Sequence, residues 1–594
     1  MSVHIDLLYG QQAQTALDDH RFLALWRSLH DKCPHSTAFQ APNFVRTWYA
    51  AYRAHWQPVI IQSQDSKGDL VGLWLLAYNP FDERLAHAGA QQAEYHTWVS
   101  LSGEDIPFLS AAWPELKRRF AFTTLRFRYL PTAELSGMLQ TALGTKNTFV
   151  RRRHRPFLNL SADVIKKSFQ NKANKSKLNR LRKLGKLEFR RLTTSTELES
   201  VLEDLITYYD FQMSTAYHIA PPFLQADPQK RKFHVDMFAA APADNCVTVT
   251  YLDERPIAAF WGAVSGKTVH LGMVMHSPFL AKHSPGKLHL MQLSEHLLKE
   301  GKEVLDLTPG GEPWKERCAN AHDDVAEAVI CASPWVARWT GTLEWGKQCA
   351  DRVGVTPADV NATLARLDQL RPSAVARKVR NWAEMKRELC LYRCDRTLAE
   401  RYRHDERVRC NSLCDLLSFG GGELGPSRDA FLSTAQARLE QGQSAYTISL
   451  DNRLAYCGWM ASNPAEFYIA EVKQSTTFPT ASVLLHDIYM DPEVSDRGLH
   501  QAAISHMVCA ASVNKETRYV YIAVSADNLR ARDVIERMGF EYQGSLFREG
   551  RFGIERKWMS RMLAQSADGN CELPYPRPVS QESERKALNL ENPL

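Results

Sequence analysis

The sharpest change in hydrophobic pattern along this chain falls within residues 482–540. Ser482–Met490 is an apolar run rich in β-formers, and Asp491-Pro492 ends it because proline has no amide hydrogen for a sheet ladder. From Leu499 the apolar residues recur every three or four positions, which is typical of one face of an amphipathic helix. Arg518–Val524 returns to an apolar run before another helical stretch. The pattern predicts strand, turn, helix, strand and helix.

Two glycines stand where such a turn passes into a helix. Gly498 precedes the helix that starts at Leu499, and Gly286 follows the expected strand His270–Met275 and precedes the helix Lys287–Glu300. The first turn of a helix has free backbone N–H groups and the positive end of the helix dipole, so it can hold a phosphate. A residue without Cβ lets such a ligand approach. The sequence therefore predicts two anion-binding helix N-termini.

Alternating strand and helix patterns cover most of the remaining chain. The other predicted helices are Phe22–His30, residues 42–52, Lys175–Leu187, Thr196–Ser214, Lys230–Ala241, Trp335–Val353, Asp359–Leu370, Ala374–Lys386 and Ser427–Glu440. The other predicted strands are Val59–Gln62, Leu70–Tyr78, Leu125–Leu130, Cys246–Leu252, Pro256–Val264, Val304–Leu307, Leu389–Cys394, Ala445–Leu450 and Leu454–Ala461. We expect the aromatic residues Trp48, Tyr49, Tyr52 and Trp56 to belong to the core rather than to a binding site.

Composition narrows the class of protein without naming a function. A chain of 594 residues exceeds one core, and 44% hydrophobic with 24% charged residues is typical of a folded globular protein. A net charge of +6 gives no general reason to expect nucleic acid. We see no secretory signal and no apolar run of about 18 residues, so we expect a cytoplasmic protein without a transmembrane segment.

Cysteine spacing offers one candidate metal site. The 12 cysteines include the pairs Cys390/Cys394 and Cys410/Cys414. Each pair has a three-residue gap, whereas zinc sites more often have two, and the first pair lies in a predicted strand. We therefore expect reduced thiols and no metal.

Residues 151–191 form a basic segment. They contain 15 Lys and Arg residues against two acids, Asp163 and Glu188. Within the helix predicted over Lys175–Leu187, leucines recur every three positions between cationic flanks. Such a surface can contact RNA, anionic lipid or the phosphates of a coenzyme, or it can simply be solvated.

The region from residue 482 onward resembles the GNAT superfamily of acyl-CoA N-acyltransferases. That family joins an Arg/Gln-x-x-Gly-x-Gly/Ala loop over the coenzyme A pyrophosphate to a later Asn-x-x-Ala helix that ends in Gly-Phe. Here the matching residues are Gly498, Leu499, Asn528, Ala531 and Gly539-Phe540. The resemblance implies that the coenzyme contacts the following residues: Arg497, Gly498, Leu499, His500 and Asn528.

Three positions depart from that pattern. Ser495 stands where the family has Arg or Gln, and His500 replaces the last small residue of the loop. Ile535 stands where many members have the tyrosine that protonates the leaving thiolate. These departures put catalysis by this module in question, and a binding role for it stays open.

The middle of the chain resembles the CelD/BcsL group, which are FemAB-like proteins with two GNAT-type halves found with bacterial cellulose and exopolysaccharide synthesis. The resemblance rests on Ser284-Pro285-Gly286-Lys287-Leu288, on Glu300-Gly301 and on residues 306–315, with Leu307 and Trp314 where the group has Phe and Tyr. It covers about residues 1–332. It implies an acyl-CoA donor held by Ser284, Gly286 and Lys287.

Together the resemblances imply an α/β (α+β) fold of tandem GNAT-like modules with mixed central sheets flanked by helices. The expected division is an N-terminal GNAT-like half at 1–150, a second half at 151–332, a helical connector at 333–384, a C-terminal GNAT domain at 385–564 and a flexible tail at 565–594.

Acyl transfer from a thioester needs a base and a means to favour the departing thiolate. Asp306 and Lys315 lie near the end of a predicted core strand, although a turn carboxylate and a surface lysine are equally good explanations. Asp487 is a carboxylate within an apolar strand, where burial raises a pKa toward neutrality. Alternation puts Val483, Leu485, Asp487 and Tyr489 on one sheet face.

We therefore expect an acyltransferase that moves an acyl group, acetyl foremost, from acyl-CoA to an amine or hydroxyl of a small-molecule or saccharide acceptor, with exopolysaccharide or cellulose assembly as its setting. An aminoacyl-tRNA donor is the alternative that the basic segment supports, and we expect no nucleic acid as a partner other than tRNA under that alternative. A third alternative is a non-catalytic binding or assembly protein with the same fold. The sequence does not indicate an oligomeric state.

Overall fold

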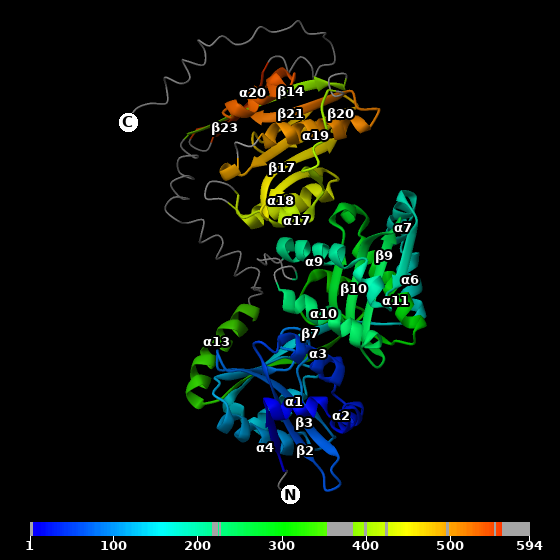
Figure 1. Ribbon diagram of the computed structural model, residues 1–594, viewed down its shortest axis with the longest axis vertical. Coiled ribbons are helices and arrows are strands. Elements are labelled where there is room, and N and C mark those ends of the chain that lie inside the picture. The colour runs from blue at the N-terminus through cyan, green and yellow to red at the C-terminus, as the bar shows by residue number, and fades with distance from the viewer. Residues whose placement is uncertain are drawn as a thin grey trace, which may run out of the picture. The chain divides into compact units, whose positions relative to one another are not determined.

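A computed structural model describes residues 4–216, 224, 227–352, 384–396, 401–421, 426–494, 498–551 and 554–560. The chain divides into two compact units, one with residues 1–366 and 419–442 and the other with residues 367–418 and 443–594 (Figure 1). We call them unit 1 and unit 2 and treat each by itself. Within the described residues no helix is long and apolar enough to cross a membrane.

The first sheet of unit 1 is antiparallel and has five strands in the order β1-β2-β3-β4, with β5 paired to β3. Its strands are β1 (Asp6–Tyr9), β2 (Gln57–Gln64), β3 (Leu70–Asn79), β4 (Arg84–His87) and β5 (Val99–Ser100). The helices of this region are α1 (Gln11–Asp18), α2 (His20–Lys32), α3 (Pro42–Tyr52), α4 (Asp105–Arg119) and α5 (Leu135–Leu143), with a 3-10 turn η1 (Ala38–Gln40). Trp26, Trp48 and Trp74 are fully buried in its cores.

The second sheet of unit 1 has eight strands in the order β6-β13-β7-β12-β11-β10-β9-β8. These are β6 (Thr124–Leu130), β7 (Thr148–Asn159), β8 (Leu187–Arg191), β9 (Asn245–Leu252), β10 (Arg255–Ser265), β11 (Thr268–His276), β12 (Val304–Asp306) and β13 (Ala321–Cys331). The associated helices are α6 (Ala162–Gln170), α7 (Lys172–Leu184), α8 (Ser195–Glu199), α9 (Leu202–Ala216), α10 (Pro228–Ala240), η4 (Pro278–His283), α11 (Pro285–Lys299), α12 (Pro313–Cys318) and α13 (Pro334–Arg352). Only β11 and β12 pair in parallel, and α11 connects them.

Unit 2 repeats this sheet strand for strand. Its order, read from the other edge, is β23-β22-β14-β21-β20-β17-β16-β15, and its one parallel pair is β20 with β21, connected by α19 (Leu499–Val513). Its strands are β14 (Glu384–Asp395), β15 (Arg409–Cys410), β16 (Ser444–Leu450), β17 (Arg453–Ser462), β20 (Ser482–Met490), β21 (Tyr519–Ser525), β22 (Glu541–Arg551) and β23 (Ile554–Met559). α17 (Leu413–Leu417), α20 (Leu529–Arg537) and the hairpin β18 (Glu466–Ile469) with β19 (Gln474–Thr477) complete it, while α18 (Arg428–Glu440) is grouped with unit 1.

Both sheets fork just beyond their parallel pair. The pairing of β11 with β12 ends at His270 and Asp306, and that of β20 with β21 ends at Leu485 and Ile522. Two residues later β11 bulges against its antiparallel neighbour β10 at Gly272, and β20 bulges against its antiparallel neighbour β17 at Asp487. A bulge bends its strand away from the partner, so each fork opens at a fixed point.

Most predicted elements are confirmed, and the differences have local causes. The helix expected over Lys175–Leu187 ends at Leu184, because extended Gly185 breaks it and Leu187 begins β8. Leu178 and Leu181 are buried as expected, but Leu184 is 52% exposed. The helix expected over Thr196–Ser214 is two helices, α8 and α9.

Several expectations fall at the limits of the described residues. The strand β14 begins at Glu384, so the last three residues of the helix expected over Ala374–Lys386 are strand. The rest of that helix, the helix at 359–370 and the tail at 565–594 lie outside the described residues. The boundary expected between residues 150 and 151 lies within β7.

Two glycines allow β10 and β11 to pack closely at the bulge beside the fork of unit 1. A Cβ on Gly262 would lie 2.3 Å from the backbone oxygen of His270, and one on Gly272 would lie 2.7 Å from that of Trp261. Because backbone atoms are the obstacle, rotation of a side chain cannot relieve the clash.

We therefore expect Gly272→Ala to lower the free energy of unfolding by about 1–3 kcal/mol, as overpacking does. Chemical denaturation measures this change. The control is Gly137→Ala in α5, where a Cβ meets nothing within 4 Å. It should be neutral or stabilising by up to about 1 kcal/mol. Equal stability of the two variants would contradict this close packing of β10 and β11.

Candidate active site

The fork of unit 1 brings an imidazole and a carboxylate together. His270 Nδ1 lies 2.9 Å from Asp306 Oδ2, and their side chains are 6% and 2% exposed. Two further groups donate to this carboxylate, the Tyr95 hydroxyl at 2.6 Å and the Thr308 amide at 2.8 Å. Arg155 Nη1 lies 3.6 Å away. The buried charge is thus compensated from several sides.

These contacts set the protonation state of the Asp306 carboxyl group. Burial disfavours the ionised form of Asp306, but the hydrogen bond with His270, the charge of Arg155 and the Tyr95 hydroxyl outweigh it and lower the pKa of the carboxyl group. Burial beside Asp306 raises the pKa of Tyr95 well above its usual value, so its hydroxyl stays a donor. An ionised Asp306 accepts from Nδ1–H of His270, which leaves the lone pair on Nε2.

His270 lines a cavity of about 320 Å³ within unit 1. The N-terminal elements α2, η1 and α3 form one side of it, and α10, β10 and β11 form the other. Phe39, Phe44, Phe233 and Trp261 are the buried rings of its wall. A largely apolar cavity with a few polar groups that converge is the usual form of a small-molecule site.

The predicted residues Asp306 and Lys315 lie on either side of one turn. Thr308 has a φ of 60°, and its hydroxyl lies 3.3 Å from Lys315 Nζ while its amide binds Asp306. The Lys315 ammonium is buried and lies 3.0 Å from Glu312 Oε2. Lys315 therefore has an ion-pair partner and is not a plain surface lysine.

The N-terminus of α11 lies among cationic side chains. Ser284, with a φ of 53°, makes no capping hydrogen bond, and its hydroxyl accepts from Lys177 Nζ of α7 at 2.6 Å. His283 is 7% exposed, and neither of its ring nitrogens has a partner among the described residues. Burial, with the charges of Lys282, Arg180 and Lys177, lowers its pKa.

Gly286 has a role in packing that the sequence did not indicate. It is the second residue of α11, and a Cβ there would lie 2.9 Å from Cδ2 of the His276 ring. Its small size thus permits close packing of α11 on the end of β11, and a contact of Gly286 with a ligand stays a prediction. Lys287 is exposed in the same helical turn.

The fork of unit 2 has a different chemistry. Leu485 and Ile522 occupy the positions that His270 and Asp306 hold in unit 1. Asp487 has a φ of 46° at the bulge, so the alternation expected along this strand is wrong: Val483, Leu485 and Ile488 share the core face. Its carboxylate is 30% exposed and lies 3.2 Å from His486 Nδ1.

The expected coenzyme contacts of unit 2 lie in varied surroundings. Gly498 has a φ of 66° at the start of α19, with open space where a Cβ would stand. Leu499 is 1% exposed in the core, and Asn528 Oδ1 caps α20 by accepting from the Ala531 amide. Burial lowers the pKa of His500 to about 4, so near pH 7 this side chain offers no charge to a phosphate. Arg497 and Ser495 lie outside the described residues.

A larger hollow of about 910 Å³ in unit 2 lies away from the fork. Residues 479–481 and 515–519, at the start of β20 and β21, line it. It therefore faces the end of these strands opposite to Asp487.

The cysteine pairs do not form one cluster. Cys390 and Cys394 are buried in β14, whereas Cys410 and Cys414 are exposed in β15 and α17. The described part of the chain contains no group of three or more side chains placed to ligate a metal.

Sequence reasoning missed His270 and Tyr95. His270 begins a predicted strand, and Asp306 ends the next strand that pairs with it in parallel, so the register of the two strands is the signal that was needed. Tyr95 lies in an irregular segment between β4 and β5 and gives no pattern of its own.

The partners of buried Asp306 should make the free energy of unfolding depend on pH, because they lower the pKa of its carboxyl group. A depressed native pKa gives stability that is present above the unfolded pKa, about 3.9, and is lost as pH falls through the native pKa. We expect the free energy of unfolding to fall more steeply below about pH 4 in the wild type than in Asp306→Asn. Urea denaturation at several pH values tests this. Asp163→Asn on exposed α6 is the control and should keep the wild-type slope.

Comparison with known proteins locates one domain. Residues 168–316 match the acetyltransferase (GNAT) domain model, and this range includes η4, α11, His270, Asp306 and Lys315. No curated protein sequence matches the chain.

Solved structures with similar regions share little sequence with it. FemX has 9% identity, a TM-score of 0.37 and coverage of 51% of this chain and 95% of its own. L-PGS from Bacillus licheniformis has 8% identity, a TM-score of 0.34 and coverage of 54% and 95%. A tandem GNAT protein from the clavulanic acid biosynthesis pathway has 15% identity, a TM-score of 0.21 and coverage of 62% and 99%. The chain has a mixed α/β fold with two large mixed sheets, and the residues that match the GNAT domain model include β8 to β12 of the eight-stranded sheet of unit 1.

Proposed function

We propose that this protein is a GNAT-type acyltransferase that moves an acyl group, acetyl foremost, from acyl-CoA to an amine or hydroxyl acceptor, and that unit 1 carries out the reaction. The observation that carries the proposal is the buried pair His270–Asp306, which borders a cavity within the residues that match the GNAT domain. A histidine oriented by a carboxylate is a recurring general base.

In the proposed reaction an ammonium acceptor first gives one proton to His270 Nε2, which frees the lone pair that attacks the thioester carbonyl, whereas a hydroxyl acceptor gives up its proton as it attacks. A bond forms from the acceptor nitrogen or oxygen to the acyl carbon and the carbon–sulfur bond breaks. The departing thiolate takes up the second proton of the amine nitrogen, or for a hydroxyl acceptor the proton held by His270. Asp306 holds the imidazole in the tautomer that exposes this lone pair and stabilises the imidazolium that forms. Tyr95 keeps Asp306 in place through its hydroxyl.

The donor's phosphates fit the N-terminus of α11. Lys177, Arg180 and Lys282 give this end a positive potential, and the neutral ring of buried His283 has one N–H group available as a donor. These groups add to the helix dipole. Ser284, Gly286 and Lys287 remain the predicted contacts, and Lys315 and Asp306 the predicted site residues near the acyl group.

Unit 2 has a second role in this proposal. The aliphatic pair at its fork has no proton to move, so Asp487 with His486 is the remaining candidate for acid–base chemistry there. Gly498 and His500 stay predicted contacts of a coenzyme. The setting in exopolysaccharide or cellulose assembly, the domain boundaries and a cytoplasmic location stay proposals from the sequence.

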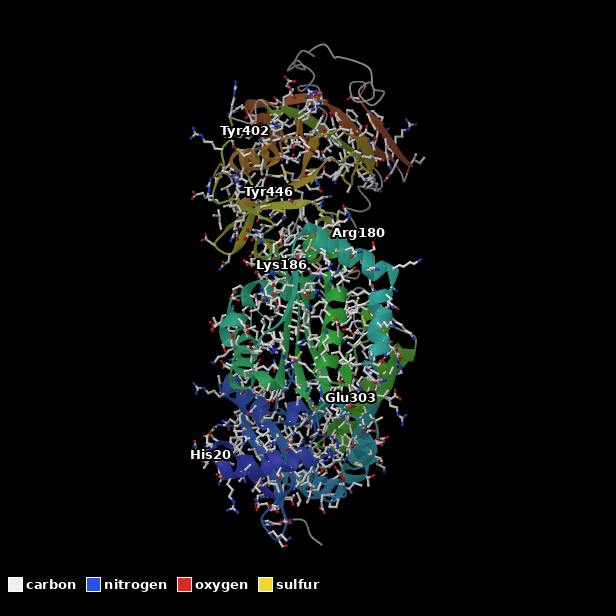
Figure 2. The ribbon with its side chains drawn as sticks, turned by 90° about the vertical axis from the view of Figure 1, so that its right-hand side faces the viewer. His20, Arg180, Lys186, Glu303, Tyr402 and Tyr446 are labelled. Carbon is white, nitrogen blue, oxygen red and sulfur yellow. The ribbon has the colours of Figure 1, made fainter. Side chains whose placement is uncertain are left out.

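An aminoacyl-tRNA donor is the second candidate, and one observation favours it. Arg180 and Lys186 lie at one end of the eight-stranded sheet of unit 1, and Glu303 lies at the other (Figure 2). Exposed cations of α7 thus stand beside the N-terminus of α11, more of them than a diphosphate needs.

The first test removes the base. We expect His270→Gln and Asp306→Asn each to lower kcat by about 100-fold or more, because general-base catalysis contributes about 10²–10⁴. The assay follows thiol release from acetyl-CoA with a panel of amines and alcohols. His154→Gln is the control, since His154 is an exposed histidine of β7. Unchanged kcat in both variants would remove unit 1 as the active module.

The second test separates the donors. Alanine at Lys175, Lys177, Arg180 and Arg182 should abolish tRNA binding if tRNA is the donor, and wild-type binding should then weaken steeply with salt. Under an acyl-CoA donor the wild type shows no tRNA binding, and acetyl-CoA raises its melting temperature. If neither donor binds, the non-catalytic alternative gains.

A further inference from the structure

The cavity beside His270 has one continuous aromatic wall. The His270 ring lies 5.7 Å from Phe39, Phe39 lies 5.3 Å from Phe44, and Phe44 lies 5.3 Å from Phe233, measured between ring centroids. The three phenylalanines are each at most 5% exposed. A ligand that reaches the His270 ring therefore has apolar surface beside it over the length of this wall.

Three amide side chains that border the cavity, Asn43, Gln92 and Asn245, are already engaged with the protein. The Gln92 carbonyl accepts from the Trp48 indole at 3.0 Å, and Asn43 Nδ2 donates to Asp244 at 2.8 Å. Asn245 Nδ2 donates to two backbone oxygens of α10 and its end. A ligand with many hydroxyl groups would give up hydrogen bonds to water here without replacements, which costs about 1–3 kcal/mol for each buried group.

The charged side chains that line the cavity are mostly carboxylates. Asp31, Glu94 and Asp244 border it, against one guanidinium, Arg27. Arg128 and Lys315, which are not among the lining residues, also act on the charge of Glu94. Glu94 Oε2 lies 3.1 Å from Arg128 Nη2. Glu94 Oε1 has no hydrogen-bond partner among the described residues. Burial lowers the pKa of His234 to about 3, so this ring adds no positive charge near pH 7.

Glu94 also lies next to the residues that form the candidate catalytic site. It precedes Tyr95, whose ring lies 5.4 Å from that of His270 and whose hydroxyl binds Asp306. Its side chain is 18% exposed. Glu94 is therefore adjacent in sequence to the tyrosine that binds Asp306, the partner of the general base His270.

We propose that this cavity is the acceptor site and that it takes a small primary ammonium with an aromatic or apolar carbon skeleton, an arylalkylamine being the simplest case. The ammonium binds beside Glu94, and the skeleton lies on the wall of Phe39, Phe44 and Phe233. A volume of about 320 Å³ suits a compact molecule rather than a glycan chain. Catalytic use of the site rests on the proposed function, but binding to it does not.

Binding without any acyl donor tests the site. Isothermal titration calorimetry of the whole protein compares 2-phenylethylamine, its hydroxyl counterpart 2-phenylethanol, and glucosamine. We expect the arylalkylamine to bind about tenfold or more tighter than either of the others, because a hydrogen bond to a charged group contributes about 1.5–3 kcal/mol. This comparison uses wild-type protein and so does not depend on the folding of a variant.

A matched pair of variants then locates the ammonium. Glu94→Gln should weaken binding of 2-phenylethylamine about tenfold or more. Glu115→Gln in α4 removes a carboxylate that is likewise paired with an arginine, Arg118, and should leave binding unchanged. The proposal is overturned if the alcohol or glucosamine binds as tightly as the amine, if none of the three binds, or if the two variants behave alike.

Turnover separates this proposal from the proposed function. Tight binding of the amine without acetyl transfer would retain the cation site and reject the acyltransferase. Acetyl transfer to hydroxyl acceptors by a protein that does not bind the amine would retain the acyltransferase and reject the cation site.

Discussion

The buried carboxylate of Asp306 is the constraint on which the rest of unit 1 depends. A charge that is 2% exposed is stable only if neighbouring groups replace the water it has lost. Here the replacements come from distant parts of the chain: Tyr95 from the N-terminal region, Arg155 from β7 and His270 from β11. The two sheets of unit 1 are therefore joined at a site where loss of one partner would leave a charge uncompensated.

The same constraint explains why the two repeated sheets differ in chemistry. Both fork after their parallel pair and both bulge two residues later, so the backbone provides the opening in each unit. Among the described residues, only the fork of unit 1 has partners, such as Tyr95 and Arg155, that compensate a buried charge at that point. In unit 2 the equivalent residues Leu485 and Ile522 are fully buried and need no partner. The polar pair of unit 2, His486 and Asp487, lies instead at the bulge itself.

Sequence periodicity predicted the strands and helices well because apolar spacing reports local burial directly. It placed Gly498 at a helix start and Ala503, Ile504 and Met507 on a buried face. It failed where local signals compete: Gly185 overrode the leucine spacing of α7, and the bulge at Asp487 reversed an alternation. Two of the four side chains that build the candidate site were predicted. Asp306 and Lys315 stood out as polar groups at a strand end, but His270 and Tyr95 acquire meaning only from strand register and from contacts between residues 211 positions apart.

One detail of strand order has a consequence for dissecting the protein. In unit 1 the edge strand beside β13 is β6, which comes before the other strands of its sheet in the chain. In unit 2 the equivalent edge strand is β23, which comes after the other strands of its sheet. A fragment cut at residue 151 would lack β6 and part of β7, leaving β13 with unpaired amides on one side and a shortened neighbour on the other. A fragment that keeps this eight-stranded sheet complete must therefore start upstream of Thr124.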